Sequence, residues 1–284
     1  MFDRYRRSLT LAKASFAILR ADRELLVFPL LSFVALLLVL IAFAVPFSLT
    51  GLNHGSLTAV GAVIAFLFYV VMYTVGFFFN SALIGAALIR LGGGDPTVRD
   101  GLRIARSHIG AIVGYAVLSA TVGIVLRYIA ERLGFIGQIV ISIIGFAWTV
   151  ATFLVVPVLV AEGMGPIEAV KQSAELLRKT WGEQLIGNVG IGLIFGLPTL
   201  LVGLVAIVLG IAVAAVSSTL VVGVLVVAFL VIFAISIVAQ ALTGIYTASL
   251  YRYATKGDAG AFDTDALSAA FKPRAGGAKG LFGR

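Results

Sequence analysis

Cysteine is absent from the 284-residue sequence, histidine occurs only twice, and charged residues make up only 12% of the chain. Without cysteine there can be no disulfide bond, thiolate metal site or cysteine nucleophile. A soluble domain has about a quarter charged residues and is about half apolar, whereas 61% of this chain is hydrophobic and its mean hydropathy is +1.11. The composition therefore excludes a soluble protein.

The residue types that carry enzyme chemistry are also sparse. His54 and His108 fall in different predicted connections, so they cannot be expected to share a metal or a proton. The string 92–95, Gly-Gly-Gly-Asp, resembles half of an intramembrane aspartyl protease site, but no apolar run supplies a second aspartate. No glycine-rich loop ends in a lysine and a hydroxyl residue. We therefore predict no catalytic residue, no cofactor and no metal site.

Long uncharged apolar runs predict an all-α, polytopic transmembrane bundle of six spans, because about 20 apolar residues cross a bilayer. The first run is too long for a cleaved signal peptide and is taken as a span. Three runs exceed one bilayer thickness, so a seventh span would require one of them to break. Kinks are expected at Pro46, Pro157 and Pro198. The six runs are Leu25 to Leu49, Leu57 to Ile89, Ile109 to Leu126, Phe135 to Ala161, Leu185 to Val216 and Leu220 to Tyr251.

Positive charge is distributed very unevenly between the predicted connections. Nineteen of the 21 lysine and arginine residues fall on one side of the six spans, and only Arg127 and Arg132 fall on the other. The positive-inside rule then places both termini in the cytoplasm of a cell whose inner membrane holds the protein. The net charge of +8 lies in short segments beside the membrane, so we expect anionic lipids of the inner leaflet as partners and no nucleic acid.

Each cytoplasmic segment that precedes an odd-numbered span has a helical, amphipathic pattern. The predicted organisation is an amphipathic N-terminal helix in 1–24, a six-helix domain in 25–251 with further cytoplasmic helices near 96–108 and 166–181, and a mostly disordered cytoplasmic tail in 252–284. Pro96 and Pro166 are expected to start the two internal helices. Two interpretations stay open: these helices lie in the inner leaflet, or they are connectors packed under the bundle. The basic side chains expected to contact headgroups are Arg6, Lys13, Arg20, Arg99, Arg103 and Arg106.

No charged residue lies in the centre of a predicted span, which removes the usual sign of ion or proton transport. The amides Asn80, Asn188 and Gln240 are the candidates to line a cavity, although hydrogen bonding between helices is the favoured explanation for them. Arg127 and Glu162 lie at span ends, where their side chains can reach the interface. Two Gly-x-x-x-Gly strings, at 110–114 and 192–196, favour close helix packing within one chain or in a homo-oligomer.

Two stretches carry a family resemblance. The first segment runs from Pro157 through Glu162, Pro166 and Lys171 to Ser173, and the pair Trp-Gly follows it at 181–182. The second is the stretch 17–31, with Asp22 and Glu24. Both resemble an uncharacterised six-helix family of prokaryotic membrane proteins. The first segment is more distantly similar to the membrane domain of some glycerophosphodiester phosphodiesterases. The resemblance implies six helices over about 8–255 and a bacterial or archaeal membrane, and it implies no activity.

Three functions are compatible with these patterns. A non-enzymatic organiser of lipids or of other membrane proteins is favoured by the repeated cytoplasmic helices and the uncharged span centres. A transporter of a small solute or lipid is the alternative, because the proline-containing spans permit movement. A lipid-modifying enzyme is the third, since scattered polar residues could converge in three dimensions.

Overall fold

The structure is a computed structural model, and it describes residues 14–49, 59–132, 134–181, 191–214 and 217–258. These residues form helices and no strand. Residues 14–21 are helical and are called the first helix. The elements after it are η1 (Arg23–Leu26), α2 (Val27–Leu49), α3 (Ala59–Leu91), α4 (Val98–Ser107), α5 (Ile109–Arg132), α6 (Gly134–Ala151), α7 (Val155–Glu162), α8 (Pro166–Trp181), α9 (Ile191–Ala214) and α10 (Ser218–Lys256). The predicted all-α class is confirmed.

Five described helical stretches are long and apolar enough to cross a membrane: Arg23–Leu49, Ala59–Leu91, Ile109–Arg132, Gly137–Glu162 and Ser218–Lys256. The remaining predicted span corresponds to α9, a helix of 24 residues that contains the shorter apolar stretch Leu200–Leu209. The polytopic helical bundle expected from the sequence is therefore present.

The long second and sixth apolar runs form helices that do not break within the described residues. α3 has 33 residues and α10 has 39, so at 1.5 Å per residue each is longer than the bilayer core of about 30 Å. α10 also continues to Lys256, beyond the predicted end of the last span at residue 251. Pro46 lies inside α2 without ending it, and Pro198 lies inside α9. The break occurs in the fourth span, between α6 and α7, just before Pro157.

The buried core gathers at one end of the bundle, where η1, the first turns of α2, the last third of α3, α4, the start of α5, α7, α8 and the last third of α10 meet. We call this region the hub. Its largest fully buried side chains are Phe28, Leu25, Leu83, Ile84, Ile112, Leu154, Leu159, Leu177, Ile245 and Leu250. Small residues allow the close approach: Gly244 of α10 faces Leu83 of α3, and a Cβ at position 244 would lie 2.4 Å from a Leu83 methyl carbon.

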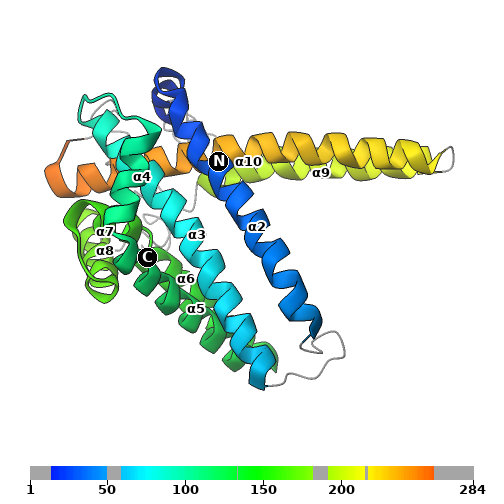
Figure 1. The fold of residues 1–284 in the computed structure, drawn as a ribbon, viewed down its shortest axis with the longest axis horizontal. Helices are drawn as coiled ribbons and strands as arrows, with labels where there is room; N and C mark the ends of the chain where they lie inside the picture. The colour runs from blue at the N-terminus through cyan, green and yellow to red at the C-terminus, as the bar shows by residue number, and fades with distance from the viewer. Residues whose placement is uncertain (1–13, 50–58, 133, 182–190, 215–216, 259–284) are drawn as a thin grey trace, which may run out of the picture.

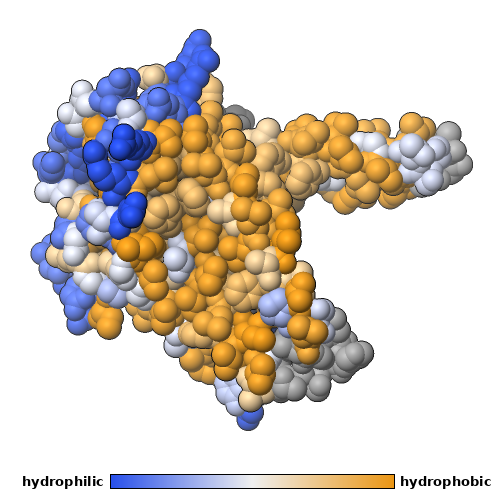
Figure 2. Space-filling view, in the orientation of Figure 1, coloured by the Kyte–Doolittle hydropathy of each residue, from blue (hydrophilic) through white to orange (hydrophobic). Residues whose placement is uncertain are grey.

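Away from the hub the helices diverge. α9 and α10 form an antiparallel pair that points away from α2, α3, α5 and α6 (Figure 1). Large apolar side chains are exposed along the outer parts of α2, α6, α9 and α10, and hydrophobic residues cover these helices whereas hydrophilic residues gather over the hub (Figure 2). A ring contact between α2 and α10 joins Phe33 and Phe233, with centroids 4.4 Å apart.

Candidate functional site: the polar end of the hub

Charged and polar side chains from distant parts of the sequence meet at the solvent-facing end of the hub. Arg252 of α10 donates from Nη1 to the backbone oxygen of Leu91, 2.6 Å away, and so ties the end of α10 to the end of α3. Glu24 of η1 accepts a hydrogen bond of 2.9 Å from the backbone N–H of Val98. These two contacts place the beginning of the first span, the end of the second and the end of the last at one polar surface.

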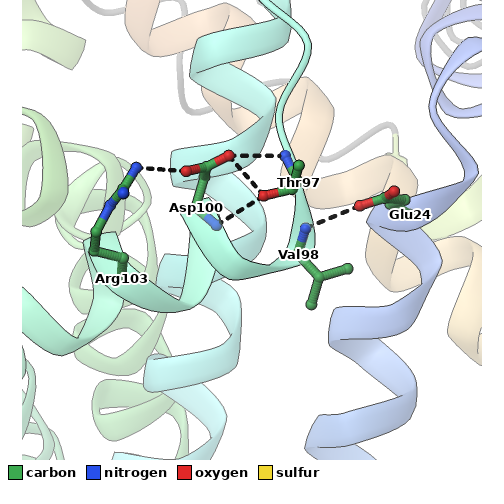
Figure 3. A network of polar contacts seen from close by, with 5 residues as sticks. All are labelled: Glu24, Thr97, Val98, Asp100 and Arg103. Atoms are coloured by element: carbon green, nitrogen blue, oxygen red, sulfur yellow. Dashed lines mark hydrogen bonds and ion pairs between the residues drawn. The ribbon is translucent and has the colours of Figure 1, made fainter.

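The N-terminus of α4 is closed by its own side chains and by Glu24 (Figure 3). Thr97 is the N-cap: its Oγ1 accepts from the Asp100 N–H at 3.2 Å, and its own N–H donates to Asp100 Oδ2 at 3.1 Å. This reciprocal pair is a capping box. The hydrogen bonds from Thr97 hold the pKa of Asp100 below its usual range. Carboxylates thus accept from the N–H groups of Thr97 and Val98, and the Thr97 hydroxyl accepts from that of Asp100. The helix begins at Val98, so Pro96 precedes the cap and does not start the helix as predicted.

The arginines of α4 lie on the face opposite its buried side. Arg99, Arg103 and Arg106 are all exposed. Arg103 donates to Asp100 in an ion pair, whereas Arg99 and Arg106 form no ion pair with any described residue. Arg20 is likewise exposed at the end of the first helix. The other two predicted headgroup contacts, Arg6 and Lys13, lie outside the described residues.

The buried side of α4 faces protein rather than lipid. Gly101 lies against α3 and α2 so closely that a Cβ there would be 2.6 Å from the backbone oxygen of Ala82 and 2.5 Å from the Phe28 ring. Ala105 is fully buried. The sequence left two interpretations open, and this face of α4 fits the second, a connector packed under the bundle.

α8 packs on the broken fourth span through its own buried face, which includes Ala169, Ser173 and Leu177. The turn between α6 and α7 leaves the backbone N–H of Leu154 without a helical partner, and it donates instead to Ser173 Oγ at 3.0 Å. Pro157 has no N–H, so it cannot continue the ladder of helical hydrogen bonds through this point. The kink expected at Pro157 is thus combined with a contact from α8, and α8 begins at Pro166 as predicted.

The charged residues at span ends have specific partners. Glu162, at the end of α7, accepts a hydrogen bond of 2.8 Å from the Tyr251 hydroxyl of α10. Arg127 pairs with Glu131 one helical turn later, at the far end of α5. His108 contacts the backbone oxygen of Ile104 through Nδ1 at 2.9 Å, which requires the hydrogen to be on Nδ1.

The predicted cavity amides do not meet in the described part of the chain. Asn80 is half-buried on α3 and Gln240 is exposed on α10, and no contact joins them. Asn188 lies outside the described residues. Within those residues there is also no group of three or more histidine, aspartate or glutamate side chains that could hold a metal ion.

Two residues of this region, Asp22 and Ser173, were named only for the family resemblance, and the sequence predicted no role for either. Asp22 is buried although it stands in a hydrophilic triplet, Asp-Arg-Glu at 22–24, that is typical of an exposed connection. Ser173 lies on the apolar side of α8, and its role depends on a residue 19 positions earlier in the chain. The only sign of this role in the sequence is that Ser173 is a polar residue on the apolar side of a helix.

Apolar helices of spanning length, a shared hub and charge concentrated at one polar end define a polytopic helical membrane protein. The chain belongs to the family described as Family of unknown function (DUF6159), whose model matches residues 59–262. This agrees with the resemblance to an uncharacterised family. The more distant likeness to the membrane domain of glycerophosphodiester phosphodiesterases is not among these findings and stays a prediction. No curated protein and no solved structure matches the chain.

Proposed function

We propose that the protein is a non-enzymatic organiser of the membrane, in which the hub holds apolar helices apart so that lipids or other membrane proteins occupy the space between them. In this proposal the hub lies at the cytoplasmic side of a prokaryotic inner membrane, because the positive charge gathers there. The exposed arginines of α4 then face anionic headgroups or acidic partners.

The contrast between the two ends of the helices carries the proposal. Side chains of the hub are almost completely buried, while Leu40 on α2 and Val226 on α10 are 54% and 51% exposed. In hydrocarbon such faces need no protein partner, because lipid tails are as apolar as leucine. A helix pair that packs only near the hub can therefore remain separated from its neighbours by lipid.

The arginine face of α4 supplies the second support. Arg99 and Arg106 are seven residues apart, about two helical turns, so they lie on one side of the helix about 10 Å apart. A buried helix side fixed by Gly101 presents them in a constant orientation. Basic side chains beside a membrane contribute about 1 kcal/mol each to the attraction for an anionic surface.

The test is to replace arginines by glutamine and measure, by mass spectrometry, the fraction of anionic lipid that stays with the gently extracted protein. The double variant R99Q/R106Q should retain less anionic lipid, whereas R103Q should have a smaller effect because Asp100 already pairs with that side chain. R127Q, at the opposite end of α5, is the matched control. Equal lipid retention by R99Q/R106Q and R127Q would remove the headgroup part of the proposal.

The break in the fourth span favours a transporter as the second candidate. Discontinuous helices form the binding sites of many transporters, and Thr152 lies in the turn of this break. A cysteine in place of Thr152 would be the only thiol of the chain. Labelling of T152C by a membrane-impermeant maleimide in intact bilayers would show a water-filled path and favour transport. No labelling there, with normal labelling of a cysteine at Gly257, would favour the organiser.

A further inference from the structure

Asp22 is a buried carboxylate that the proposed function does not use. It follows the helix that ends at residue 21, and only 7% of its surface is exposed. Its Oδ2 atom has no hydrogen-bond partner among the described residues. A carboxylate oxygen that is buried without a partner disfavours the charged form of the group, because the lost hydration is not replaced.

Arg90 is the cation that lowers the pKa of Asp22, but its guanidinium group is bonded to other residues. Arg90 Nη1 lies 3.0 Å from Asp95 Oδ1 and 3.4 Å from the backbone oxygen of Gly94. The other arginine of this corner, Arg252, donates to Leu91 and pairs with Asp258. Two further charged groups act on Asp22: Glu24, which is bonded to the N-terminus of α4, and Asp95, the partner of Arg90.

The residues beside Asp22 fasten the first helix to the hub. Ile18 and Leu19 belong to the buried core, and Ser15 is only 2% exposed, whereas Phe16 on the other face of the same helix is 52% exposed. When this helix docks, the side chain of Asp22 enters the core with it. Separation of the helix from the hub would return the carboxylate to water.

We propose that Asp22 is a proton-binding site that controls docking of the first helix onto the hub. The protonated, neutral carboxyl group stays buried without an unpaired charge, so the proton-bound form favours the docked helix. Loss of the proton leaves a charge that is satisfied only if the helix releases Asp22 to water or if Arg90 leaves Asp95 for it.

The direction of the pH effect follows from burial. Desolvation raises the pKa of Asp22 above its usual value, and the attraction of Arg90 and a hydrogen bond from the backbone of Glu24 oppose part of that rise. A group whose pKa is higher in the docked form stabilises docking at low pH, and this stabilisation is lost as the pH rises through that pKa. Each unit by which docking raises the pKa corresponds to about a tenfold change in the docking equilibrium.

The experiment uses the full chain in bilayers with one introduced cysteine, since the natural sequence has none. S15C reports release of the buried helix face, and F16C on the exposed face of the same helix corrects for the pH dependence of the thiol reaction. The ratio of maleimide labelling, S15C to F16C, should be lowest at the acid end of a pH series that starts at about pH 4, the ordinary pKa of an aspartate, and should rise severalfold as the pH passes the raised pKa of Asp22. A ratio that does not change with pH would overturn the proposal.

Two further variants assign the effect to Asp22. Adding D22N should keep the ratio low at every pH, because the amide carries no charge. E24Q is the matched control and should keep the pH dependence, since the amide oxygen of the substituted side chain can still accept from Val98. A pH dependence that persists in D22N, or that disappears only in E24Q, would contradict the assignment. Hydrogen exchange of residues 14–26 in the unmodified chain and in D22N gives the same comparison without a cysteine.

Discussion

α4 crosses α3 at Gly101. Its missing side chain lets the helix approach the Ala82 backbone oxygen, and the Phe28 ring fills the remaining space. The sequence placed a helix over this segment and its arginines on one face, but it could not identify Gly101 as a contact. Glycine within a helix weakens it locally, and only the crossing with α3 shows why the residue is suitable here.

Replacement of Gly101 by alanine should therefore destabilise the hub. The added methyl group would overlap two fixed neighbours, and overpacking of this kind costs about 1–3 kcal/mol. The expected result for G101A is a lower thermal midpoint in detergent than for the natural chain. Gly76 on α3 is the matched control, because a Cβ there meets no atom within 4 Å. Equal midpoints for G101A and G76A would show that α4 does not pack against α3 in this way.

Predictability at the level of single residues depends on whether the signal is local. The Thr97–Asp100 pair is a short-range pattern, and the sequence indicated a helix start within two residues of it. Glu24 caps the same helix from 74 residues away, and nothing in the local sequence reveals that contact. The burial of Asp22 was hidden for the same reason, because it depends on how the first helix packs on the hub.

The fourth span shows how far an element can be derived from its sequence. Its apolar run and Pro157 predicted a kinked helix, and the structure contains two helices, α6 and α7, with a turn between them. The partner of that turn is Ser173 on α8, which the sequence could not supply because the contact joins two helices. The longer second and sixth runs, which seemed the more natural places for a break, are continuous.

Removal of the Ser173 hydroxyl should loosen the contact between α8 and the broken span. In S173A the Leu154 N–H would be buried without an acceptor, which costs about 1–3 kcal/mol. We expect a lower thermal midpoint and faster hydrogen exchange of residues 152–156. In S236A, the control, the lost hydroxyl only donates to Ile232 within its own exposed helix, so little change is expected. Identical exchange in the two variants would argue against a role for Ser173 in holding the break.

At the scale of the whole molecule, hydropathy and charge predicted a polytopic helical bundle and a polar end rich in arginine. They could not predict that the helices pack closely at that end and diverge elsewhere. In a bilayer, apolar side chains are equally suited to lipid and to protein, so an apolar sequence does not show which parts of two helices touch. The close packing around Gly244, Gly101 and α7 determines instead which parts of the helices touch.

The divergence of α2 and α10 is the central feature of the proposed function, and paired cysteines test it most directly. Phe33 and Phe233 are in contact. Positions 40 and 226 each lie seven residues, about two turns, further from the hub along α2 and α10. In bilayers treated with a short bifunctional thiol reagent, we expect crosslinking of F33C/F233C and none of L40C/V226C. Efficient crosslinking of L40C/V226C within one chain would show that the helices stay together along their length and would contradict the proposed open arrangement.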